Sequence, residues 1–122
     1  MIFFVGDKPS RKNKNPKIPF VGTKSYTRLL QWIDAMDISV TDVVLCNTEN
    51  IDRLGQVNVP GLLTCVEHGD HVIALGKAAE KHLTNLKIAH FPMPHPSGLN
   101  RQNNNKDFIK KKLKECKKWL NY

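Results

Sequence analysis

The stretch HVIALGKAAEKHL, residues 71–83, changes its pattern at a single glycine. Before Gly76 the residues form a nearly continuous apolar run, which is typical of a strand buried on both faces of a parallel sheet. After Gly76 the apolar residues recur at helical spacing among charged ones. The segment therefore predicts a strand over 71–76, a turn at the glycine and a helix that continues from it.

The start of the chain repeats this order of strand, glycine and helix. IFFV, residues 2–5, is an apolar run that ends at Gly6, as in a buried parallel strand. A long polar loop follows. Apolar residues between Tyr26 and Ile33 then recur at helical spacing, which predicts a helix over about 24–36 with Thr23 or Ser25 as N-cap.

The rest of the chain adds two strands and a last helix. The β-branched stretch SVTDVVLC predicts a strand over 39–46, and KIAHF predicts one over 87–91. Residues 47–70 show no clear pattern, although PGLLTCVEHG opens with proline and is compatible with a short helix. Residues 105–120 predict an amphipathic helix with lysines outward and an inward face of Phe108, Ile109, Leu113, Cys116 and Leu120.

Strands that alternate with helices indicate a mostly parallel sheet covered on both sides. We expect one domain over residues 1–122, an α/β fold with a central four-stranded sheet in a three-layer α/β/α sandwich. Ligands of such sheets bind beyond the carboxyl ends of the strands. This rule points to the loop after Gly6, to the second strand from Asp42 to Asn47, and to the loop HFPMPHPSGLNRQNNN, residues 90–105.

The charge of the chain favours a polyanionic partner. The formal net charge is +8 at pH 7, and a basic surface raises the affinity for phosphate backbones. The positive charge is concentrated in residues 8–17 and in a second group near the C-terminal end, Lys110, Lys111, Lys112, Lys114, Lys117 and Lys118. We expect DNA, single- or double-stranded, as the partner.

The sequence has no apolar run near the roughly 18–20 residues of a membrane helix, so we expect a cytoplasmic protein without a membrane partner. We also expect a monomer. The cysteines Cys46, Cys65 and Cys116 form no CxxC pair, which favours reduced thiols and no metal site. We expect no cofactor.

Four segments in order resemble the uracil-DNA glycosylase superfamily, and most closely its family 4. VGDKPS and PFVGTKSYTRLL resemble the GEAPG and PFVGRAGQLL segments, and HPSGLNR resembles the HPSALLR or HPSPLSR loop. Between them, VTDVVLCN resembles ITNVVKCR, and VIALGKAAEKHL resembles IVALGKTAAQALL. The chain is shorter than family 4 members and lacks their four cluster-binding cysteines, so an iron–sulphur cluster is excluded on ligand count.

The resemblance implies a monofunctional DNA glycosylase that acts on uracil or a modified pyrimidine flipped out of DNA. In this interpretation Asp7 positions the attacking water, and His95 stabilises the leaving base by donating a hydrogen bond to its oxygen. Gly6 borders the base. Phe20 stacks on the base, or anchors the long loop in the core.

The remaining implied roles concern DNA. Ser25 and the backbone N–H groups around it receive a phosphate, unless Ser25 is a simple N-cap. Ser97 and Arg101 contact phosphates. Leu99 fills the gap left by the flipped nucleotide, or packs its loop onto the body of the protein.

Two positions depart from the family pattern. Asp42 stands where the family has an asparagine, and an ionised carboxylate offers the base only acceptors. Asp42 thus favours a base with an exocyclic NH₂ group or a modified thymine, unless it is protonated or Asn47 supplies the amide instead. Lys8 replaces a small residue and adds charge beside the pocket. Two alternatives therefore stay open: a catalytically silent DNA-binding protein with the same fold, and a phage-type enzyme of pyrimidine modification.

Overall fold

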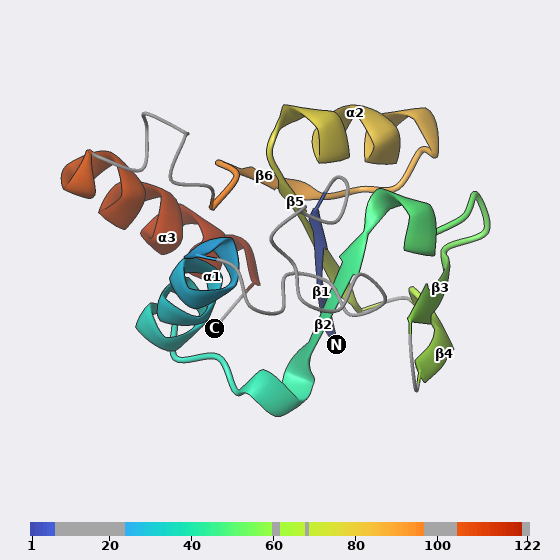
Figure 1. Cartoon of the computed structure of the whole chain (residues 1–122), viewed down its shortest axis with the longest axis horizontal. Coiled ribbons are helices and arrows are strands. Elements are labelled where there is room, and N and C mark those ends of the chain that lie inside the picture. Colours follow the sequence, from blue (N-terminus) through green and yellow to red (C-terminus); the bar gives the residue numbers. More distant parts are fainter. Residues whose placement is uncertain (7–23, 60–61, 68, 97–104, 121–122) are drawn as a thin grey trace.

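The computed structural model describes the chain outside residues 7–23, 60–61, 68, 97–104 and 121–122. A four-stranded sheet forms its centre (Figure 1), with the strand order β2 (Val43–Asn47), β1 (Ile2–Gly6), β5 (His71–Leu75) and β6 (Phe91–Met93). All neighbouring pairs are parallel. The predicted four-stranded sheet is confirmed.

Three helices cover the sheet: α1 (Lys24–Ala35), α2 (Lys77–Asn85) and α3 (Lys106–Leu120). The side chains of β1 alternate between the two faces. Ile2 and Phe4 pack in one apolar cluster with residues of α1 and α3, whereas Phe3 and Val5 pack in a second cluster with residues of α2. The two clusters on opposite faces of one sheet confirm the three-layer α/β/α arrangement. None of the helices in the described part of the chain is long and apolar enough to cross a membrane.

The region that the sequence left unassigned contains a second, two-stranded sheet. The short 3₁₀-helix η2 (Thr48–Asn50) is followed by an antiparallel hairpin of β3 (Gln56–Val59) and β4 (Leu62–Cys65). The possible short helix in PGLLTCVEHG is therefore wrong. Leu62–Cys65 is instead extended because each of its residues pairs with one of QVNV, which alternates between polar and apolar side chains as strands do.

The predicted strand over 39–46 begins late, at Val43. The 3₁₀-helix η1 (Val40–Asp42) takes its place at the amino end. Ser39 caps this turn, because its Oγ accepts a hydrogen bond from the backbone N–H of Thr41 at 3.4 Å. Serine side chains compete in this way with extended structure.

The predicted strand over 87–91 is also displaced, to Phe91–Met93. Lys87 and Ile88 instead belong to the turn that ends α2. Lys87 has a φ of 59°, and the N–H of Ile88 donates to the carbonyl of Leu83 at 3.0 Å. This closes the helix with a left-handed residue, as many helices end, and the chain becomes extended only afterwards. The resulting strand β6 is short, lies at the edge of the sheet and contains Pro92.

The burial of the cysteines leads to a first prediction. Burial raises the pKa of the Cys46 thiol to about 12; burial also raises the pKa of Cys116 to about 12, against the opposing effect of Lys112. Cys65 in β4 is exposed. Because the thiolate is the reactive form, we expect a thiol reagent at pH 8 to modify Cys65 rapidly in the native protein, and Cys46 and Cys116 only after denaturation. Rapid labelling of either buried cysteine in the native state would contradict the packing described above.

Candidate active site

The carboxyl ends of the four parallel strands meet at one edge of the sheet. Gly6 at the end of β1 pairs with Asn47 at the end of β2. On the other side Val5 pairs with Ala74 of β5, and Leu75 pairs with Met93 at the end of β6. Neighbouring strands lie about 4.8 Å apart, so Gly6 is roughly 5 Å from the end of β2 and roughly 10 Å from β6. We call this edge the carboxyl rim.

Asn47 is a buried polar residue at the carboxyl rim. Its exposed fraction is 2%, and no other polar or charged residue in the described part of the chain is buried to this degree. Its backbone N–H donates to Oδ1 of Asn50 at 2.7 Å. The amide of Asn50 in turn donates to the carbonyl of Asn58 in β3 at 3.0 Å. The side chain of Asn47 accepts in return from the backbone N–H of Asn50, which completes a capping box at the start of η2. The hairpin thus holds the end of β2 in place, and the rim contains a neutral amide whose NH₂ group donates and whose oxygen accepts.

Asp42 lies at the opposite end of the strands from the carboxyl rim. It precedes Val43, which pairs with Ile2 at the start of β1. Asn47 lies five positions further along the chain, at the end of β2, which is about 16 Å at 3.3 Å per residue of strand. Asp42 is also exposed. The prediction that Asp42 lies beside the base is therefore wrong: the strand that was expected to end near it only begins there.

His95 follows β6 directly and lies at the rim. It is half-buried between the buried residues Pro94 and Pro96. The N–H of Gly76 donates to the carbonyl of Met93 at 2.8 Å, which ties the start of this loop to the end of β5. The two prolines restrict the backbone on both sides of the histidine, so the fold constrains the direction in which its ring leaves the chain.

Gly76 allows this close approach. Its φ is 93°, a conformation that L residues other than glycine rarely adopt. A Cβ atom built on Gly76 would lie 3.0 Å from Cβ of His95 and 3.6 Å from its Cδ2. Gly76 therefore acts as a positioning residue for His95, a role that sequence reasoning missed because it treated Gly76 only as a turn.

This contact gives a second prediction. Gly76→Ala should destabilise the protein by about 1–2 kcal/mol, because alanine is strained at positive φ, and it should also push His95 from its position. Urea denaturation measures the first effect, and the NMR chemical shifts of the His95 ring report the second. Gly69→Ala is the matched control: Gly69 has a φ of 94° but no atom within 4 Å of the added Cβ. If both variants disturb the His95 signals equally, the contact is not what positions the ring.

A hollow of about 430 Å³ adjoins His95 on the side of α2 and α3. Its volume lies in the range of small-ligand sites. Two lysines contribute positive charge, Lys77 at the start of α2 and Lys112 of α3, opposed by Glu80. Neither lysine was expected at the site, because only the fold brings α3 beside β6 and the start of α2.

Several predicted site residues lie outside the described part of the chain: Asp7, Lys8, Phe20, Ser97, Leu99 and Arg101. Ser25 belongs to the first turn of α1, which begins at Lys24, so Ser25 is not its N-cap. The described residues bring Gly6, Asn47 and His95 to one rim and leave Asp42 away from it. In the described part of the chain, no three His, Cys, Asp or Glu residues lie close enough together to hold a metal ion.

Comparison with known families decides the relationship. The model of the Uracil DNA glycosylase superfamily matches residues 1–121. The chain belongs to the uracil-DNA glycosylase superfamily. No curated protein matches it at a significant level.

Membership in the uracil-DNA glycosylase superfamily supports a glycosylase-type activity on DNA. It also agrees with the fold, since the parallel sheet and its three helices are those expected of a uracil-DNA glycosylase-like protein.

Proposed function

We propose that this protein is a monofunctional DNA glycosylase that removes uracil from DNA by hydrolysis. The observation that carries the proposal is the common position of Gly6, Asn47 and His95 at the carboxyl rim of a chain that belongs to the superfamily. Such an enzyme extrudes the nucleotide from the stack and reads the base in a pocket.

The reaction breaks the bond between C1′ of the sugar and the base nitrogen, and the bonding electrons leave with the base. Negative charge grows on the base oxygen, where the imidazole of His95 donates a hydrogen bond. A water molecule attacks C1′, and Asp7, the residue after Gly6, positions this water and accepts its proton.

Asn47 is assigned the recognition of the base. The amide oxygen has two lone pairs, one of which accepts from the backbone N–H of Asn50. The second lone pair can accept from the N3–H of uracil, and the NH₂ group can donate to its O4. The carboxylate of Asp42 was the reason to prefer a base with an exocyclic NH₂ group. Because Asp42 lies beside the amino end of β2, away from the carboxyl rim, that reason no longer applies. Uracil becomes the favoured base over a modified pyrimidine.

Oligonucleotides that carry uracil, 5-hydroxymethyluracil or only cytosine test the proposal. After incubation with the protein, alkali cleaves the strand wherever a base has been removed. We expect cleavage of the uracil strand, which is lost with Asp7→Ala and with His95→Ala. Salt-dependent binding without abasic product for any of these strands would instead support the catalytically silent DNA-binding protein.

A further inference from the structure

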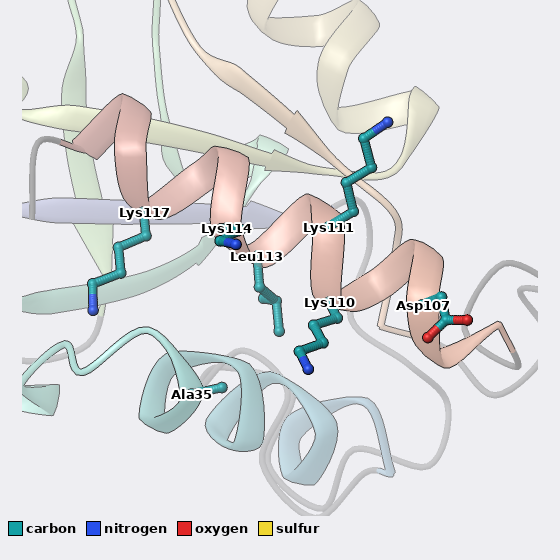
Figure 2. A pocket seen from close by; sticks show the side chains of 7 residues that line it. All are labelled: Ala35, Asp107, Lys110, Lys111, Leu113, Lys114 and Lys117. Atoms are coloured by element: carbon teal, nitrogen blue, oxygen red, sulfur yellow. The ribbon is translucent and has the colours of Figure 1, made fainter.

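A second hollow, of about 630 Å³, lies between α1 and α3, away from the pocket beside His95. Figure 2 shows the side chains of Lys110 and Leu113 directed from α3 toward α1, where Ala35 faces them. We call this hollow the α1–α3 groove. Its lining residues are Ala35, Asp107, Lys110, Lys111, Leu113, Lys114 and Lys117.

The α1–α3 groove is strongly positive. Helix α3 carries seven lysines against two acidic residues, Asp107 and Glu115. Within the part of the chain that the structure describes, Lys110 and Lys114 form no ion pair, whereas Lys117 is paired with Asp37 at 3.1 Å. Residues 110, 114 and 117 follow one another on the same side of the helix over about 10 Å, given a rise of 1.5 Å per residue. Repeated positive charge along a groove matches a ligand with repeated negative charge.

The groove leads away from the carboxyl rim. Helices α1 and α3 come after β1 and β6, whose carboxyl ends form the rim, so both helices begin at the rim and run back along the sheet. Both run in the same direction in Figure 2. Lys110 is therefore nearer the rim, and the pair of Lys117 with Asp37, just past the end of α1, lies at the far end.

We propose that the α1–α3 groove binds the phosphodiester backbone of the DNA strand that continues from the nucleotide held at the rim. This inference rests on the proposed function for the identity of the strand. Lysines serve as point charges for phosphates. Among the described residues that line the groove none is aromatic, so these residues offer charge for phosphates and no stacking surface for bases.

The test uses the double variant Lys110→Ala/Lys114→Ala and a labelled single strand of about 20 nucleotides without uracil, long enough to pass beyond the rim. Fluorescence anisotropy at several salt concentrations gives the slope of log K against log salt. Loss of two phosphate contacts should reduce this slope by about 1.4 and weaken binding at 0.1 M salt by about 10- to 30-fold. Lys110→Arg/Lys114→Arg should bind like the unchanged protein.

The matched control is Lys81→Ala/Lys118→Ala, which removes the same charge from exposed lysines of α2 and α3 outside the groove. If the control weakens binding as much as the groove variant, or the groove variant binds normally, the groove is not a binding site. Because the strand contains no uracil, these outcomes are independent of base removal, so failure of the groove and failure of the proposed reaction remain distinguishable.

Discussion

Replacement of His95 with alanine should lower the rate constant for base removal by about 100- to 1,000-fold, as loss of one donor to a developing oxyanion does elsewhere. The reason is positional: the ring is held at the rim between two buried prolines and against Gly76. Its hydrogen bond strengthens as charge moves onto the base, so the effect should appear in kcat rather than in KM. Single-turnover kinetics on a uracil strand measure it directly.

His90→Ala is the matched control for this variant. His90 is half-buried like His95 and lies just before β6, where its Nδ1 contacts the carbonyl of Ile88 at 2.8 Å. We expect this variant to retain the full rate. A His95→Ala protein that loses only affinity, with kcat unchanged, would show that His95 holds the substrate and does not stabilise the leaving base.

The second large effect is expected at Asn47. Asn47→Ala should lower kcat/KM for uracil by roughly 5- to 150-fold, because a bidentate contact with a base edge contributes about 1–3 kcal/mol. Asn47→Asp should penalise uracil similarly, since a carboxylate offers only acceptors and faces the O4 oxygen. The same variant should gain activity on cytosine relative to the unchanged protein, because cytosine presents an NH₂ group at that position.

Asn58→Ala controls for indirect effects through the hairpin. Asn58 is exposed, and only its backbone carbonyl receives the hydrogen bond from Asn50, so removal of its side chain leaves the support of β2 intact. Thermal unfolding of each variant separates loss of recognition from loss of stability. If Asn47→Ala removes uracil at the normal rate while folded, base recognition lies with other residues.

The main elements of the fold could be predicted because their signals are local. The apolar run before Gly76 and the helical spacing around Leu29 each depend on a few neighbouring residues, and both elements lie close to their expected bounds. The hairpin was missed because its strands are short and are stabilised by pairing with each other, which local pattern does not reveal.

The site was predicted less completely, for the same physical reason. Asp42 lies in the β-branched stretch 39–46 and Asn47 directly follows it, so which of them reaches the rim depends on where the strand starts and ends. The turn capped by the hydroxyl group of Ser39 sets that start. Strand propensities of single residues do not include such a hydrogen bond. The role of Gly76 beside His95 depends on the pairing of β5 with β6, two elements separated by a helix.

The short strand β6 has a consequence beyond the site. A sheet normally ends in a row of free backbone donors and acceptors that can template the addition of a strand from another molecule. Here that row is three residues long, and Pro92 in its middle has no N–H to offer. The strand that carries His95 to the rim therefore also protects this side of the protein from edge-to-edge aggregation.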